Sequence, residues 1–289
     1  MLDQVLTLAD GRTVGFSDYG QKDGAPVLWC HGGPGNRLPS AGAHEAAAAR
    51  GLRIIGIDRP GYGLSSLRPG RTIADWVPDG LAVADHLGLD RVFTVGVSTG
   101  GAYALALDAL APERVRAVVT GGAMTDMRHP PARASMSGPT TLGVWDAPSR
   151  EAAVAVAAEV FGEDGSKMMG GLSGLPAADL AVLTAPADPA AAARSQAANF
   201  VNGVQAYVDD RRADGPGWFS FDVGAVSCPV IIVHGESDTI VPVVAAHHTA
   251  SLIPHAELRL FQPLGHFSVG PEVFNALGDL MARPHGATA

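Results

Sequence analysis

The chain has 289 residues, of which 47% are hydrophobic and 17% are charged, and its formal net charge is −9. This length and composition exclude a disordered tail and favour one large α/β domain, or a core with an inserted subdomain. The acidic balance makes nucleic acid and anionic membranes poor partners, because like charges repel.

The first part of the chain shows short apolar strands that alternate with helices. Asp10 and Gly11 form a turn signal inside a predicted hairpin at residues 5–16. Further strands are predicted at residues 26–30, 52–58, 91–97 and 115–120, and helices at 41–50, 72–89 and 99–110. Pro78 should weaken the first turns of the second helix. Buried strands separated by helices indicate βαβ units and a parallel sheet.

The alternation stops after about residue 125, in a stretch rich in Ala, Gly, Pro and Met. Helices are predicted there at residues 151–161 and 190–208, and no strand is convincing. The alternation then resumes with strands at 229–233 and 257–261 and helices at 243–253 and 271–283. We therefore predict a doubly wound, mostly parallel α/β sheet from residues 1–125 and 223–289, with a helical insertion at residues 126–222.

Cofactor, metal and targeting signals are not visible. Cys30 and Cys228 each lie in an apolar run without neighbouring ligands, which predicts two buried free thiols and a reducing compartment. The motifs G-x-x-x-x-G-K and H-E-x-x-H do not occur, so no nucleotide or metal is expected. No signal peptide and no membrane-spanning run is recognisable, which predicts a cytoplasmic protein.

The strongest local signal is the sequence Gly96-Val97-Ser98-Thr99-Gly100, placed where a predicted strand meets a predicted helix. A tight turn at this junction lifts a serine hydroxyl above the sheet, and the glycines avoid steric clashes. The positive end of the new helix favours negative charge near the serine. Ser98 is therefore predicted to be a nucleophile.

A serine hydroxyl needs a base to become a nucleophile. Among the ten histidines, His266 follows a strand and lies in a loop, which suits a base that must reach another loop. Asp238 also follows a strand and precedes His266 in the chain, so it is the predicted acid that orients the imidazole. Asp126 follows an earlier strand and stays open as the alternative acid.

Together these motifs resemble the α/β-hydrolase superfamily, whose triad follows the chain order Ser, Asp, His. The resemblance covers about residues 5–283 outside the insertion. It rests on HGGPGNR at 31–37, DRPGYGLS at 58–65, GVSTGG at 96–101, HGESDTIVP at 234–242 and GH at 265–266. It implies that the insertion is a cap over the substrate pocket. It also implies an oxyanion hole formed by the backbone N–H groups of Gly33 and Thr99, since Pro34 has no N–H.

Other polar and apolar residues are expected to have supporting roles. His31 is predicted to hold the loop that carries Gly33, and Asp58 and Arg59 to brace their own loop. Large side chains of the insertion are expected to pack within it, namely Met136, Trp145, Phe161, Met168, Met169, Phe200 and Trp218.

The expected reaction is hydrolysis of a small carboxylic ester through an acyl-enzyme, without a cofactor and with a small apolar molecule as the partner. Proline iminopeptidases share HGGPG but usually carry Trp where this chain has Thr99, and they need acidic cap residues to hold an amine. Carbon–carbon bond hydrolases and perhydrolases share the triad, whereas haloalkane dehalogenases use Asp as the nucleophile. A ligand-binding receptor, or an inactive relative on the same fold, is the alternative of another class.

Overall fold

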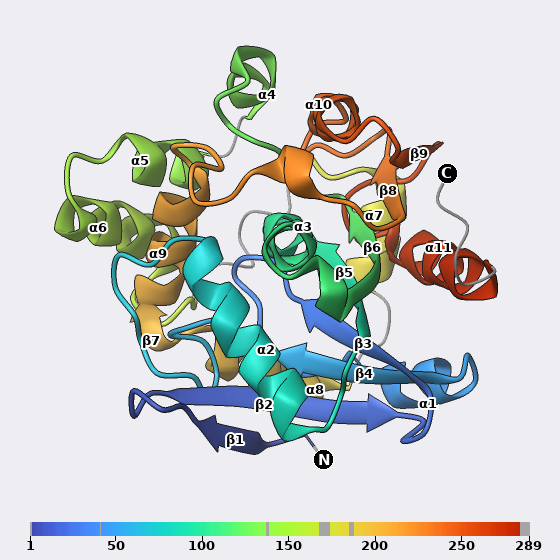
Figure 1. Cartoon of the computed structure of the whole chain (residues 1–289). Helices are drawn as coiled ribbons and strands as arrows, with labels where there is room; N and C mark the ends of the chain where they lie inside the picture. The colour runs from blue at the N-terminus through green and yellow to red at the C-terminus, as the bar shows by residue number, and fades with distance from the viewer. Residues whose placement is uncertain (1, 41, 137–138, 168–173, 185–187, 284–289) are drawn as a thin grey trace.

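The computed structural model describes residues 2–40, 42–136, 139–167, 174–184 and 188–283 (Figure 1). An eight-stranded sheet crosses the molecule in the order β1-β2-β4-β3-β5-β6-β8-β9. The strands are β1 Gln4–Thr7, β2 Thr13–Gly20, β3 Ala25–Cys30, β4 Leu52–Ile57, β5 Val92–Val97, β6 Val115–Gly121, β8 Val230–Gly235 and β9 Glu257–Phe261. The pairs β1–β2 and β2–β4 are antiparallel and the others are parallel, which confirms the predicted sheet.

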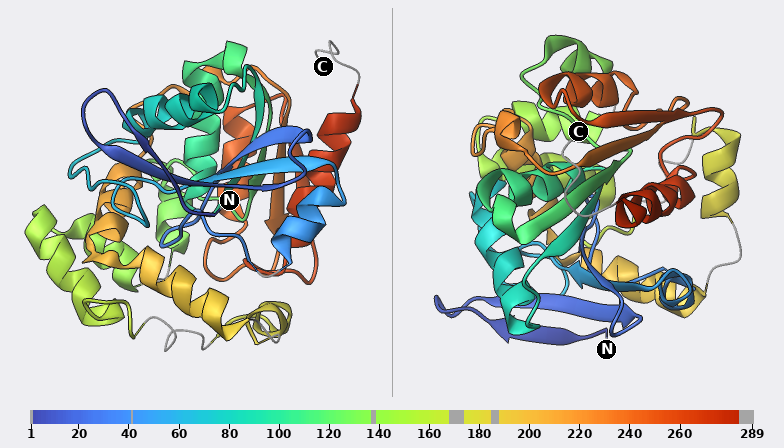
Figure 2. Two further views of the ribbon diagram at one scale, coloured as in Figure 1. Left: turned by 90° about the horizontal axis from the view of Figure 1, so that it is seen from below. Right: turned by 45° about the vertical axis from the view of Figure 1, so that its right-hand side comes forward.

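Helices cover both faces of this sheet. One layer contains α2 (Val77–His86), α3 (Gly100–Leu110) and α10 (Val244–Leu252), whose apolar residues share a core with Leu28 and Ile55. The other layer contains α1 (Ala43–Ala48) and α11 (Gly270–Ala282), which pack on Val27 and Ile54. Neighbouring residues of one strand thus point to opposite faces, as the pleat requires. The doubly wound arrangement is visible from below and from the side (Figure 2).

The start of the helix predicted at residues 72–89 is not α-helical, in line with the effect expected of Pro78. A 3₁₀ turn occupies Ala74–Trp76, and α2 begins at Val77 with Pro78 in its first turn. The missing N–H costs nothing at this position, because the first N–H groups of a helix have no intrahelical partner. Both thiols are buried and free, as predicted.

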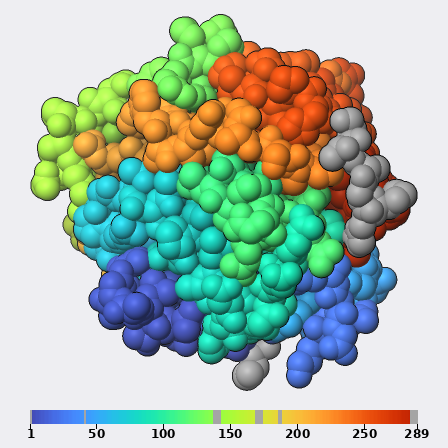
Figure 3. Space-filling view, viewed as in Figure 1, coloured from blue at the N-terminus to red at the C-terminus, as the bar shows by residue number. Residues whose placement is uncertain are grey.

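The chain between β6 and β8 forms a helical segment beside the sheet, called the insertion below (residues 126–222). Its elements are α4 Pro130–Ser135, α5 Pro139–Asp146, α6 Arg150–Phe161, α7 Ala177–Leu183, α8 Pro189–Asn199, β7 Val201–Val204 and α9 Gln205–Asp214. Val144, Ala153, Phe200 and Val208 lie in a small core of its own. The light green part of the insertion forms one edge of the molecule (Figure 3).

The single helix predicted at residues 190–208 is wrong, and so is the expectation that the insertion has no strand. The helix α8 ends at Asn199, β7 follows, and α9 begins at Gln205. Gly203 has a φ of 58°, which a helix does not allow. The Asn202 side chain donates to the carbonyl oxygen of Gly61 at 2.8 Å, so a contact with the core replaces the helical turn.

None of the helices in the described ranges combines the length and the apolar character needed to cross a membrane.

Candidate active site

Ser98 lies in a strained turn between β5 and α3. Its φ of 53° makes it the one non-glycine residue with a positive φ among the residues that the structure describes. The flanking glycines are required for space, because a Cβ at Gly96 would clash with the carbonyl oxygen of Gly100, and one at Gly100 with that of Cys30. The turn therefore has the form of the predicted nucleophile elbow, and Ser98 stays partly exposed.

His266 and Asp238 form a direct pair. Nδ1 of His266 lies 2.8 Å from Oδ2 of Asp238. The other carboxylate oxygen accepts from the backbone N–H groups of Ile240 and Val241, each at 2.8 Å. Because an ionised carboxylate only accepts hydrogen bonds, His266 carries its proton on Nδ1 and leaves Nε2 free to accept one.

The ends of four neighbouring strands bring these residues together. Ser98 follows β5, Gly122 follows β6, Asp238 follows β8 and His266 follows β9. Ser98 N–H donates to the carbonyl oxygen of Gly121 at 3.0 Å, and a Cβ at Gly122 would lie 3.2 Å from Nδ1 of His266. Within the described ranges the Ser98 hydroxyl makes no hydrogen bond, and such bonds often tighten only with substrate.

Gly33 and Thr99 lie against each other beside Ser98. A Cβ at Gly33 would lie 2.8 Å from the Thr99 hydroxyl, and one at Gly32 would lie 3.4 Å from Cβ of Ser98. Neither the Gly33 nor the Thr99 backbone N–H donates to another described protein group. Two unpaired donors near a serine hydroxyl suit an oxyanion hole.

Comparison with known proteins gives the family. The sequence model of the family described as alpha/beta hydrolase fold matches residues 25–272 of this chain. The chain belongs to the α/β-hydrolase fold family. A 2-hydroxymuconate semialdehyde hydrolase of Pseudomonas putida is 30% identical over 90% of this chain and 86% of its own length. A non-heme haloperoxidase of Rhodococcus erythropolis is 29% identical over 90% of this chain and 92% of its own length.

The fold also agrees with a solved structure. A hydrolase from Pseudomonas aeruginosa has a TM-score of 0.70 over 97% of this chain and 98% of that chain, at 21% identity. The predicted α/β-hydrolase resemblance is thus confirmed, and family membership together with the relatives supports a hydrolase.

His31 holds the loop that carries Gly33, as predicted from the sequence. Its Nε2 accepts from the backbone N–H of Arg59 at 3.1 Å, so its proton is on Nδ1, which donates to Gly32 O at 2.7 Å. Burial, and then the charge of Arg59, lower the pKa of His31 well below its usual value. A neutral imidazole with both nitrogens in use is a structural group.

Asp58 and Arg59 brace their loop as expected, and Arg59 also contacts the insertion. Asp58 accepts from the backbone N–H groups of Arg37 and Leu64, at 2.7 and 2.9 Å. Arg59 donates to the carbonyl oxygens of His31 and Gly32. Its ion pair with Asp210, at 2.7 Å, connects this loop to α9 of the insertion.

Asp126, the alternative acid, lies outside the Asp238–His266 pair. Its carboxylate accepts from the Arg128 side chain and from the Arg128 backbone N–H at 3.0 Å, and from the Trp218 backbone N–H at 3.3 Å. Burial favours the neutral carboxyl, but the hydrogen bonds from Arg128 dominate and lower the pKa of Asp126.

A buried ionic cluster in α9 is the main feature that the sequence interpretation missed. Asp210 is fully buried between Arg59 and Arg71, and these cations outweigh burial and hold its pKa below the usual range. Arg211 donates to the Thr99 hydroxyl and to Sδ of Met124. A Cβ at Gly33 would lie 3.4 Å from Nη2 of Arg211, so the insertion touches the candidate oxyanion hole.

Asp214 completes this cluster. It forms an ion pair with Arg211 at 2.6 Å, and burial raises its pKa to about 6 despite that pair. The run Asp209 to Asp214 has the composition of a solvated helix face. Its dense alternation of acids and arginines was the available signal for a buried network.

The large side chains of the insertion divide into three groups. Phe161 and Phe200 pack within the insertion, whereas Trp218 lies in the main core and contacts Phe221. Met136 belongs to a methionine cluster with Met124, Met127, Val241 and Ala245, against which Trp145 packs. This methionine cluster touches the Ser98 turn, because Met124 N–H donates to Ser98 O at 3.2 Å. Met168 and Met169 lie outside the described residues.

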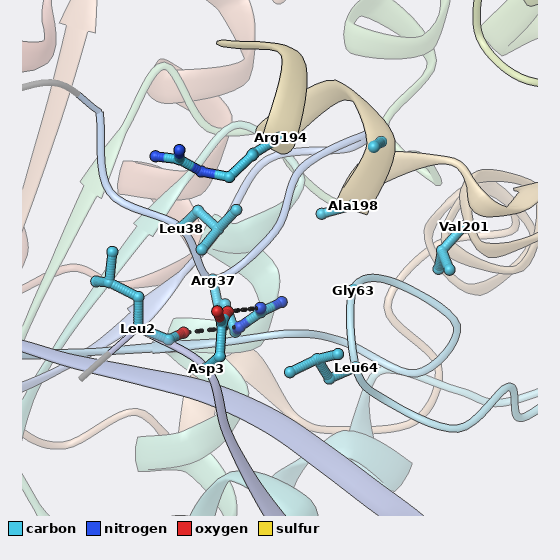
Figure 4. A pocket seen from close by; sticks show the side chains of 10 residues that line it. Leu2, Asp3, Arg37, Leu38, Gly63, Leu64, Arg194, Ala198 and Val201 are labelled. Atoms are coloured by element: carbon cyan, nitrogen blue, oxygen red, sulfur yellow. Dashed lines mark hydrogen bonds and ion pairs between the residues drawn. The ribbon is translucent and has the colours of Figure 1, made fainter. Parts of the chain in front are cut away.

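A pocket of about 580 Å³ lies away from these residues, between the N-terminal segment and α8 (Figure 4). Leu2, Leu38, Leu64 and Val201 line it with Arg37, whose guanidinium pairs with Asp3. It includes none of the predicted site residues. In the described ranges no three His, Cys, Asp or Glu side chains are grouped to hold a metal ion.

Proposed function

We propose that this α/β-hydrolase is a serine hydrolase that cleaves a small carboxylic ester through an acyl-enzyme on Ser98. The strained Ser98 turn carries the proposal, since a positive φ at a buried strand–helix junction serves to present the side chain. The Asp238–His266 pair and the unpaired N–H groups of Gly33 and Thr99 supply the other groups that acyl transfer needs.

In the proposed mechanism, Nε2 of His266 takes the Ser98 proton as Ser98 attacks the ester carbonyl. Asp238 stabilises the imidazolium that forms, through the 2.8 Å contact with Nδ1. The N–H groups of Gly33 and Thr99 hold the oxyanion, and the positive end of α3 adds to their effect. His266 then protonates the leaving alcohol and activates a water that releases the acid.

We further propose that the insertion acts as a cap. It reaches the candidate site at three places, through Arg211 on Thr99, through Met136 in the methionine cluster and through Asp179 on the backbone of His266. Apolar side chains beside a serine nucleophile suit a small apolar acyl group.

The buried acids of the insertion argue against an aminopeptidase. A free substrate amine needs an unpaired carboxylate, whereas the buried aspartates of the insertion in the described ranges all have partners. These are Asp126 with Arg128, Asp179 on the His266 loop, Asp209 with Arg150, Asp210 with Arg59, and Asp214 with Arg211. An amine bound to one of these aspartates would break an existing ion pair or, at Asp179, the hydrogen bonds from the His266 loop.

Cleavage of a carbon–carbon bond is the second candidate. The observation that favours it is the 30% identical relative of Pseudomonas putida, which is named as a 2-hydroxymuconate semialdehyde hydrolase. The same serine, histidine and aspartate would serve that reaction.

A substrate panel tests the proposal. Values of kcat/KM are measured for p-nitrophenyl acetate and butyrate, prolyl-p-nitroanilide and 2-hydroxymuconate semialdehyde. The proposal expects ester turnover that Ser98→Ala abolishes, and wild-type rates for Ser251→Ala, whose exposed hydroxyl contacts only the backbone of α10. Preference for the semialdehyde selects the second candidate, and a folded protein that turns over none of these compounds contradicts both.

A further inference from the structure

Helix α7 is attached to the protein through a buried carboxylate, and none of its apolar side chains is fully buried. Asp179 is its one buried residue, with 0% of its surface exposed, whereas Leu180 and Val182 are 37% and 49% exposed. In the right-hand view of Figure 2 α7 lies beside α11, and in every view of Figures 1 and 2 it lies apart from α5 and α6. The attachment of this part of the insertion therefore depends on Asp179.

Both carboxylate oxygens of Asp179 accept hydrogen bonds from the loop that carries His266. Oδ2 accepts from the backbone N–H of His266 at 2.8 Å. Oδ1 accepts from the backbone N–H groups of Phe267 and Ser268, at 3.0 and 2.8 Å, and from the Ser268 hydroxyl at 2.7 Å. Three consecutive N–H groups thus converge on one anion, and hydrogen bonds to an ionised group are about twice as strong as neutral ones.

Gly265 is the residue that makes room for this contact. A Cβ at position 265 would clash with Oδ2 of Asp179 and would lie 2.7 Å from its Cγ and 2.8 Å from its Oδ1. These are the nearest atoms, and Gly265 is not among the glycines with positive φ, so space and not backbone conformation requires the glycine. The glycine that precedes His266 in the sequence is thus explained by the close approach of Asp179.

We propose that Asp179 is a positioning residue: it fixes the backbone of the His266 loop, so that the reactivity of Ser98 depends on the docking of α7. The inference rests on the proposed roles of Ser98, Asp238 and His266. Asp238 holds the imidazole at Nδ1, and Asp179 holds the backbone of the same residue, each at 2.8 Å. Because α7 belongs to the insertion, this contact couples the insertion to the base.

The charges that face His266 give the inference a distinctive signature. Asp238 contacts the ring, Asp179 contacts the backbone N–H, and His234 lies 3.4 Å from the same Asp238 oxygen. Loss of the Asp179 charge disfavours the imidazolium, so the acid limb of the kcat/KM profile should move to lower pH. Because this shift follows from the charge alone, amide exchange at residues 266–268 is needed to show whether Asp179 also holds the backbone.

The first variant is Asp179→Asn, which keeps the shape but places an NH₂ group among N–H donors. We expect the kcat for p-nitrophenyl acetate and the rate of fluorophosphonate labelling to fall by about 10²-fold, the cost of a displacement of roughly 1 Å, with little change in KM. Hydrogen exchange at the amides of residues 266–268 should become faster. Asp164→Asn is the matched control, because this aspartate of the insertion bonds only to the nearby Ser166.

The second test works from the other side of the contact. Gly265→Ala should reproduce the loss by displacing the carboxylate, and it should cost far less in an Asp179→Ala background, because the clashing atoms are gone. If Asp179→Asn does not fold, this pair of variants still tests the inference, because Gly265→Ala alone must lower kcat and speed amide exchange at residues 266–268.

Two results would overturn the inference. One is an Asp179→Asn protein with wild-type kcat, labelling rate and amide exchange. The other is a Gly265→Ala penalty of equal size with and without Asp179. If wild-type Ser98 is not labelled, the proposed function fails, and amide exchange at residues 266–268 in Asp179→Asn still shows whether α7 holds this loop.

Discussion

Replacement of Asp238 by asparagine should remove almost all turnover without changing the shape of the site. Oδ1 of Asp238 accepts from the N–H groups of Ile240 and Val241, each at 2.8 Å, so the amide oxygen must occupy this position. The amide NH₂ then faces Nδ1 of His266 and donates to it, which moves the imidazole proton to Nε2. That nitrogen can no longer accept the proton of Ser98.

The expected loss is about 10³–10⁴ in kcat, as in other triads whose imidazole carries its proton on the wrong nitrogen, or roughly 4–5.5 kcal/mol of transition-state stabilisation. Steady-state hydrolysis of p-nitrophenyl acetate measures it, and circular dichroism checks the fold. Asp126→Asn is the control and should cost less than about tenfold, because Asp126 contacts Arg128 and Trp218. A large loss for Asp126→Asn and a small one for Asp238→Asn would refute this reasoning.

Three further predictions concern stability and specificity. Burial lowers the pKa of both His31 and His234 below 6.5, so these side chains take up protons in the unfolded chain before they do so in the folded protein. As the pH falls below 6.5, each histidine should therefore reduce the free energy of unfolding by up to about 1.4 kcal/mol per pH unit. Urea denaturation at pH 7.5 and 5.5 measures this slope, which His31→Gln should reduce; a flat profile would contradict it. Arg211→Met should destabilise by about 3–5 kcal/mol at pH 8, because it leaves Asp214 buried without a cation, and adding Asp214→Leu should restore most of the loss in the same assay. Met136→Ala should raise the butyrate-to-acetate ratio of kcat/KM roughly tenfold by opening the methionine cluster, and an unchanged ratio with lower stability would make Met136 a packing residue only.

Features with local causes could be predicted from the sequence. Apolar runs such as residues 52–57 give strands because both faces are buried, and the glycines around Ser98 mark a turn that larger residues cannot form. The order of Asp238 and His266 along the chain follows from the same strand pattern. The structure brings these two together at 2.8 Å, while the role of each as acid and base stays a prediction.

Features that depend on long-range contacts could not be predicted. Asp179 and Arg211 resemble solvated helix residues in the sequence, because their partners are 87 and 112 residues away. The break at Gly203 depends on a bond from Asn202 to Gly61, and no periodicity reports it. In each case the tertiary contact decides the structure and overrides the local pattern.

Mass-spectrometric mapping of a fluorophosphonate adduct tests the central claim most directly. Wild-type protein should gain one adduct on the peptide that contains Ser98, Ser98→Ala should gain none, and His266→Ala should react far more slowly while keeping its fold. An adduct on any other residue, or labelling that survives in Ser98→Ala, would contradict the assignment of Ser98 as the nucleophile.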